Sequence, residues 1–157
     1  MLVYAPSYDF GIWGIEKLHP FDSHKFSKAF SLLRKRLGAE LERVCKSPVS
    51  AITDDELRLV HDASYLASLT SPEVVATALE LAPLKWLPSA LVDRGLLQPM
   101  RWATAGTSLA VHSVLTGDSP IAMNLGGGFH HAFRDHGEGF CIYADVAIAL
   151  AVERARG

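Results

Sequence analysis

The sequence has few cysteines, no long hydrophobic run and no surplus of positive charge, and each absence excludes a class of protein. Its two cysteines, Cys45 and Cys141, lie far apart, so neither a disulfide framework nor a paired Cys-x-x-Cys metal site is expected. Fifteen lysines and arginines against seventeen aspartates and glutamates disfavour direct binding to nucleic acid. The most apolar stretches are shorter than the roughly 20 residues that a helix needs to span a bilayer. We therefore expect no membrane span.

The amino terminus also lacks the basic region and long apolar core of a secretory signal peptide. Because the two thiols are expected to stay reduced, this favours an intracellular location, cytoplasmic, or cytoplasmic and nuclear if the source is eukaryotic. The length of 157 residues and the 49% hydrophobic content suffice for one domain with a real core. No repeat, low-complexity tract or internal linker divides the chain.

Strand and helix patterns alternate along the sequence. Three short apolar runs predict buried strands at residues 2–5, 49–52 and 121–125. Four segments have the spacing or end signals of helices: residues 26–37, 72–82, 99–116 and 144–156. Thr53 and Glu56 match a capping box, which predicts a further helix that carries Leu57, Val60 and His61. This order indicates an α/β fold with a parallel sheet flanked by helices.

The predicted sheet is small for so many helices, and the chain stops after a helix, where an α/β unit would next supply a strand. We therefore expect residues 1–157 to be the N-terminal part of a single larger domain, or a truncated one, with the C-terminal strands missing. Apolar faces of the strand at 121–125 and of the last helix would then be uncovered. Such exposed apolar surface favours self-association.

Two adjacent histidines, His130 and His131, follow the third predicted strand on a glycine-rich loop, Asn-Leu-Gly-Gly-Gly-Phe-His-His. The carboxyl end of a strand is the usual side for a site in an open α/β sheet. Two imidazoles there could act as base and acid near neutral pH, because their ordinary pKa is about 6.5. The loop matches neither a phosphate-binding Gly-Lys-Ser/Thr loop nor a dinucleotide fingerprint. Taken alone, each histidine fits a structural or exposed role better than a catalytic one.

The segment NLGGGFHHAFRDHGEGFCIYADVAIAL resembles the signature of the histone deacetylase family: glycines, paired histidines, a variable spacer, and Gly-Phe-Cys leading into a helix. Its Gly-Gly-Gly-Phe-His-His and Tyr-Ala-Asp are similar to those of class IV enzymes. The resemblance extends to VYAPSYDFGIWGIEKLHPFDSHKF, DELRLVHDASYLASL and LPSALVDRGLLQPMRWATAGTSLA, and so covers nearly the whole chain in order. It implies part of an arginase-like α/β domain that hydrolyses acylated lysines of proteins in a tunnel over a zinc ion.

The resemblance also implies roles for individual residues. His131 would be the principal proton acceptor and donor, and His130 would orient the water. Gly128, Gly139 and Phe140 would bind the substrate, with the aromatic ring against the lysine methylenes. Asp22, in the family-like His-Pro-Phe-Asp element with His19, would shape the tunnel rim, although a structural loop contact fits this element equally well.

Zinc is expected for the complete domain, but the family's metal ligands come after this helix and are not in this chain. The isolated chain is therefore expected to be inactive. A local zinc site is disfavoured, because neighbouring residues rarely converge tetrahedrally on one centre. Such a site would draw its donors from His130, His131, Asp135, His136, Glu138 and Cys141. Two alternatives to a deacylase stay open: a non-catalytic truncated homologue that acts as a binding or interaction module, and a small histidine-dependent hydrolase with a locally assembled metal. The resemblance to class IV enzymes makes long fatty-acyl lysine a candidate substrate beside acetyl-lysine.

Overall fold

A computed structural model describes residues 1–12, 14 and 22–157, and its sheet is small and parallel. β1 (Leu2–Val3) lies between β2 (Cys45–Lys46) and β3 (Met123–Asn124). Both pairs are parallel, with Leu2 opposite Cys45 on one side and opposite Met123 on the other. The predicted class, a parallel sheet flanked by helices, is confirmed.

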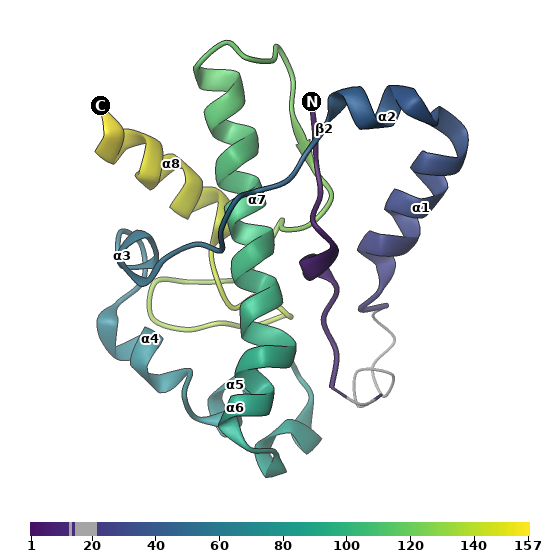
Figure 1. Cartoon of the computed structure of the whole chain (residues 1–157). Coiled ribbons are helices and arrows are strands. Elements are labelled where there is room, and N and C mark those ends of the chain that lie inside the picture. Colours follow the sequence, from purple (N-terminus) through teal and green to yellow (C-terminus); the bar gives the residue numbers. More distant parts are fainter. Residues whose placement is uncertain (13, 15–21) are drawn as a thin grey trace.

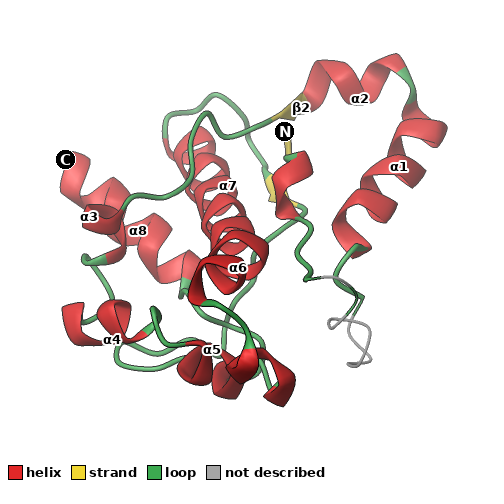
Figure 2. Cartoon of the chain, turned by 60° about the horizontal axis from the view of Figure 1, so that its bottom comes forward, coloured by secondary structure: helices red, strands yellow, loops and turns green. Residues whose placement is uncertain are grey.

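Helices make up most of the molecule (Figures 1 and 2). Their bounds are α1 Lys25–Leu37, α2 Ala39–Val44, α3 Asp54–Leu57, α4 Ala63–Ser68, α5 Pro72–Ala78, α6 Ser89–Val92, α7 Gln98–Leu115 and α8 Asp145–Arg156. Short 3-10 turns occupy Pro6–Tyr8 and Ala82–Trp86, and a π-helical turn occupies Asp93–Leu97. No helix among the described residues is both long and apolar enough to cross a membrane.

The long helix α7 is the centre of the fold. It packs against α8 on one side and against β1 and β3 on the other (Figure 1). Small side chains such as Ala103 and Ala110 are buried on it, which lets the neighbouring chain come close. The approach is closest at Gly106, because a β-carbon there would overlap the hydroxyl of Tyr8. The α7 surface therefore sets the path of the chain on both sides of it.

Residues 49–52 do not form the predicted second strand. The strand lies earlier, at β2, where the backbone pairs with β1. Ser47 then donates its hydroxyl to the Tyr4 carbonyl oxygen at 2.5 Å, and the chain turns away from the sheet. Val49 is 99% exposed, whereas Ile52 is buried and its N–H donates to the Arg101 carbonyl oxygen of α7. The apolar run therefore lies along α7 and not in the sheet.

Two helices end earlier than predicted. The capping box is present, since Thr53 Oγ1 accepts the Glu56 N–H and the Glu56 carboxylate accepts the Thr53 N–H, but α3 ends at Leu57 and does not carry His61. The helix that begins at Pro72 ends at Ala78 and not at residue 82, because Glu80 takes a left-handed φ of 53° that a helix cannot contain.

The third strand is also shorter and more exposed than predicted. β3 covers only Met123–Asn124, and the side chains of Ile121 and Met123 are 74% and 62% exposed. No described strand pairs with its outer edge. The apolar run that predicted a buried strand at 121–125 therefore faces solvent in part.

Candidate active site

The histidine loop begins at the end of β3, beside α7. Asn124 donates from Nδ2 to the Ala103 carbonyl oxygen at 2.9 Å and to Thr107 Oγ1 at 3.0 Å. Its Oδ1 accepts the backbone N–H of Gly126 at 3.3 Å. A β-carbon at Gly126 would lie 2.5 Å from the ring of Tyr8, so only glycine lets the chain pass here. The direction in which the loop leaves the sheet is thus set by α7 and Tyr8.

The buried carboxylate of Asp145, the first residue of α8, fixes the histidine loop by hydrogen bonds to its backbone. Its two oxygens accept the backbone N–H groups of Gly128 and Phe129, each at 2.8 Å, and the Thr107 hydroxyl at 2.6 Å. A helix N-terminus also favours a negative charge. A β-carbon at Gly127 would overlap this carboxylate. The backbone that carries the two histidines is therefore tied to α7 and α8 at once.

The two histidine rings lie side by side at the surface, with their centroids 4.2 Å apart and their planes at 43°. Nδ1 of His130 lies 2.9 Å from the Gly128 carbonyl oxygen. Because a carbonyl oxygen only accepts, Nδ1 carries the hydrogen and Nε2 is the basic nitrogen of a neutral ring. The ring of His131 lies against Gly139, where a β-carbon would be 3.1 Å from the ring carbons.

A tight turn brings Gly139 and Phe140 to the histidines. Both residues are left-handed, with φ of 53° and 67°, which is unusual for a residue as bulky as phenylalanine. The Phe140 N–H donates to the Ala78 carbonyl oxygen at 3.1 Å, and the Cys141 N–H donates to that of Glu138 at 2.9 Å. Such a conformation costs about 1–2 kcal/mol and persists because these bonds hold it. The result is an aromatic ring fixed at the wall of a pocket.

This pocket has a volume of about 150 Å³ and lies beside the histidine pair. It brings together five of the six predicted site residues: Gly128, His130, His131, Gly139 and Phe140. The rings of Phe10, Phe26 and Phe129 also line it, as does Lys25, whose pKa is lowered by burial. Burial likewise raises the pKa of the Cys141 thiol, which therefore stays protonated at neutral pH. The arrangement suits an apolar chain with a polar group that reaches the imidazoles.

Asp22, the sixth predicted residue, does not line this pocket. It lies at the start of α1, where Oδ1 accepts the His24 N–H at 3.0 Å and Oδ2 pairs with Lys28 Nζ at 2.7 Å. The bond from Lys28 lowers the pKa of the Asp22 carboxyl group. His19 lies outside the described residues. The described contacts of Asp22 are those of a helix start.

His61 is a supporting residue for which the sequence predicted only a place on a helix. It is buried, and its Nε2 accepts the Ala144 N–H at 3.0 Å while Nδ1 lies 3.3 Å from the Arg134 carbonyl oxygen. Burial lowers the pKa of His61, so the ring is neutral near pH 7. The nearby Tyr65 hydroxyl donates to the Ile142 carbonyl oxygen at 2.8 Å. These contacts hold the far end of the loop, as Asp145 holds its beginning.

The described residues do not form a metal site by themselves. No group of three histidine, cysteine, aspartate or glutamate side chains in this part of the chain lies close enough to hold a metal ion. Near the histidines, both oxygens of Asp145 already accept hydrogen bonds, and Cys141 is a buried thiol. The donors for a locally assembled metal, such as Asp135 and His136, pair with each other at the surface.

The fold and the histidine loop define an α/β protein with the site at the end of a sheet strand, and comparison with known proteins gives its family. The histone deacetylase domain matches residues 19–156. The chain is 40% identical over 149 residues to histone deacetylase 2 of Arabidopsis thaliana, covering 95% of this chain and 38% of that protein. It is 31% identical over 152 residues to the acetoin utilization protein AcuC of Bacillus subtilis, covering 96% and 38%. The chain belongs to the histone deacetylase domain family.

A solved structure shows the same fold. The crystal structure of the HDA15 HD domain superposes with a TM-score of 0.70 at 18% identity, covering 99% of this chain and 44% of that one. The chain thus spans less than half the length of each of these relatives. The predicted partial deacetylase fold is confirmed by this match.

Proposed function

We propose that this chain supplies the histidine pair and part of the substrate tunnel of a class IV type acyl-lysine hydrolase. The placement of His130 and His131 beside an aromatic-walled pocket of about 150 Å³ carries the proposal. An acyl-lysine is a long apolar side chain with one amide to be cleaved, and the pocket combines apolar walls with two imidazoles at the surface. Family membership gives the reaction class, amide hydrolysis.

In this reaction the oxygen of water bonds to the acyl carbon, the C–N bond breaks, and the lysine amine leaves with a proton. His131 takes the proton from the attacking water and returns it to the leaving amine. An imidazole suits both steps, because its ordinary pKa lies near neutral pH. His130 orients the water, with its Nδ1 hydrogen held by the Gly128 carbonyl oxygen. Phe140 packs on the lysine methylenes, and Gly128 and Gly139 leave space for them. Asp22 shapes the rim from the start of α1.

We further propose that residues 1–157 are the N-terminal part of a single larger domain, whose zinc ligands lie in a later segment. Two observations support this: the chain spans less than half of its relatives, and β3 has no described strand on its outer edge. On this proposal the 157-residue chain alone is inactive, and the protein works inside the cell on acylated lysines of proteins or peptides.

The test is an acyl-lysine peptide assay with added zinc, run on the 157-residue chain and on the full-length reading frame. We expect turnover only where the reading frame continues through further α/β units. In that protein His131→Ala should lower kcat by about 10²–10⁴, the usual contribution of a general base. His136→Ala is the matched control, because this exposed histidine pairs with Asp135 and does not line the pocket. A full-length protein that binds zinc but cleaves no acyl-lysine would contradict the proposal.

A second candidate function is a non-catalytic interaction module, and exposed apolar side chains favour it. Four apolar side chains are more than half exposed: Ile121 just before β3, Met123 in β3, and Val146 and Leu150 one turn apart on α8. Surfaces of this kind favour self-association or a partner. Sedimentation of the 157-residue chain would show oligomers that Leu150→Lys dissociates, with the exposed Arg154→Lys as control. A monodisperse monomer at high concentration would count against the module.

A further inference from the structure

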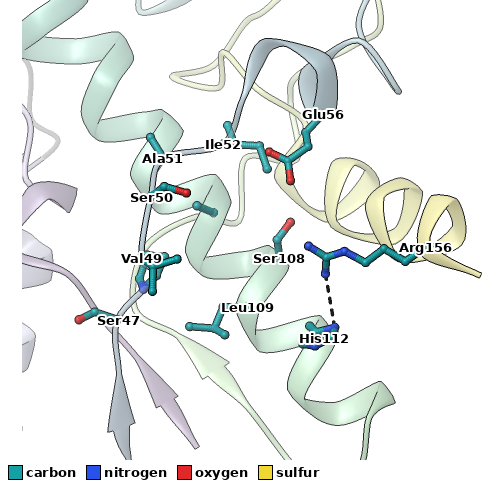
Figure 3. Close-up of a pocket in the computed structure, with 12 residues that line it drawn as sticks. Ser47, Val49, Ser50, Ala51, Ile52, Glu56, Ser108, Leu109, His112 and Arg156 are labelled. Atoms are coloured by element: carbon teal, nitrogen blue, oxygen red, sulfur yellow. Dashed lines mark hydrogen bonds between the residues drawn. The ribbon is translucent and has the colours of Figure 1, made fainter.

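A second pocket, which shares no lining residue with the histidine pocket, lies beside residues 105–112 of α7. It has a volume of about 300 Å³ and is bounded by residues 47–56, by α7 and by the end of α8. Figure 3 shows Ser108 and Glu56 pointing toward a shared space from α7 and α3, and Arg156 reaching in from α8. We call it the α7–α8 pocket.

The floor of the α7–α8 pocket holds a polar atom without a partner. Ser108 is only 9% exposed, and its hydroxyl has no hydrogen-bond partner among the described residues. It does not bond back to the carbonyl oxygen one helical turn earlier, as Thr104 does at 2.9 Å. A buried hydroxyl without a partner costs about 1–3 kcal/mol. This hydroxyl is therefore available to a bound molecule.

Two opposite charges flank this hydroxyl without pairing with each other. The Glu56 carboxylate accepts the N–H and hydroxyl of Thr53 through Oε2, and no described cation lies within 4.0 Å of it. Arg156 uses Nη1 to bind Glu153 at 2.5 Å, and the same nitrogen lies 3.4 Å from His112 Nδ1 (Figure 3), whereas no described residue pairs with its Nε or Nη2. His112 is tied to Glu153 through Nδ1 at 3.0 Å. The pocket thus offers one negatively charged hydrogen-bond acceptor, one guanidinium edge and one hydroxyl.

The rest of the lining is mixed, with Ser47, Ser50 and His112 beside several apolar side chains. Ile52 and Ala105 are buried, and Val49 and Leu109 also line the pocket. A carboxylic acid would satisfy Arg156 and Ser108 but not Glu56, and an amine would satisfy Glu56 alone. A molecule that carries an ammonium and a carboxylate on one carbon, together with an aliphatic side chain, meets all four features. The volume lies at the lower end of small-molecule sites.

We propose that the α7–α8 pocket binds a free aliphatic α-amino acid, with its carboxylate on Arg156 and Ser108, its ammonium on Glu56 and its side chain against Ile52 and Leu109. This site is separate from the histidine pocket and does not depend on the deacylase activity proposed above. An amino acid bound there would link α3, α7 and α8.

The test is a binding titration of the full-length protein with three probes of similar size: L-leucine, 4-methylpentanoate without the ammonium, and 3-methylbutylamine without the carboxylate. We expect saturable binding of leucine and at least about tenfold weaker binding of either analogue, because each loses a charge-assisted bond. Glu56→Gln and Arg156→Gln should each weaken leucine by about tenfold or more, and Ser108→Ala by a smaller factor.

Three controls accompany these variants. Glutamine can still close the capping box with Thr53, so Glu56→Gln removes the charge without opening α3. Arg154→Gln, on the exposed face of α8, should leave binding unchanged. Thermal unfolding of each variant checks that it is folded. The proposal is overturned by no saturable leucine binding, by equal binding of leucine and its analogues, or by undiminished binding in folded Glu56→Gln and Arg156→Gln.

Discussion

Replacing Asp145 with asparagine should destabilise the protein and loosen the histidine loop. An amide keeps one acceptor oxygen, so the Phe129 N–H can stay bonded, but its NH2 would face the Gly128 N–H, donor against donor. The Thr107 hydroxyl can turn toward the Ala103 carbonyl oxygen, 3.5 Å away, so we count no loss there. One charge-assisted bond is lost, at the N–H of the exposed residue Gly128, which costs about 2 kcal/mol. At about 2–4 °C per kcal/mol for a domain of this size, Tm should fall by roughly 4–8 °C.

Urea and thermal unfolding measure this loss, and amide hydrogen exchange locates it. The control is Asp118→Asn, the same substitution at an exposed carboxylate just after α7. In the wild type the amides of Gly128 and Phe129 should exchange slowly, although they lie in a loop, and Asp145→Asn should expose that of Gly128. If Asp145→Asn unfolds together with Asp118→Asn and protection is unchanged, the carboxylate does not hold the loop and the reasoning is refuted.

Three further substitutions test the surrounding structure. Burial lowers the pKa of His61 below its ordinary 6.5, so the unfolded chain takes up a proton first as the pH falls, and the protein loses stability below about pH 6.5. His61→Gln should remove this part of the slope of unfolding free energy against pH. An unchanged slope would contradict the prediction. Gly126→Ala should cost about 1–3 kcal/mol by urea unfolding, through overlap with the Tyr8 ring; Tyr8→Ala in the same chain should recover part of that cost, and independent, additive losses would argue against the contact. Thr53→Ala should lower unfolding free energy by about 1 kcal/mol through loss of the capping box, whereas no loss would mean that α3 does not need its cap.

The helices were the part of the fold that the sequence predicted best. α1, α7 and α8 each begin and end within about two residues of their predicted bounds, because long periodic patterns and glycine stops such as Gly38 average over many residues. The strands carried too little signal. β2 has only two residues, and its position is set by pairing with β1, whereas the apolar run at 49–52 belongs to the wall of α7. A propensity pattern cannot separate those two uses of valine and isoleucine.

The site was predictable where it is local in sequence. His130, His131, Gly139 and Phe140 come from one loop, so a motif could name them before any contact was known. Asp145, Thr107 and His61 reach the loop from three other elements, and only the tertiary fold brings them together. Asp145 had a visible signal, an acidic residue at the start of a helix just after Gly-Phe-Cys. His61 had no such signal, because its spacing from Leu57 and Val60 is the same as that of an ordinary packed residue on a helix.

Asp145 and His61 fix the histidine loop at its two ends. Asp145 fixes the start of the loop to α7 and α8, and His61 fixes its end through Ala144 and Arg134, so the position of the histidine pair follows from described residues alone. The described residues bring no metal-binding group to the same place. On the function proposed above, placement of the general base and supply of the metal would therefore be separate tasks. On that proposal, a 157-residue chain that keeps the amides of Gly128 and Phe129 protected yet cleaves nothing would lack the metal and its ligands rather than an ordered base. If those amides exchange freely, the histidine loop itself needs the rest of the domain.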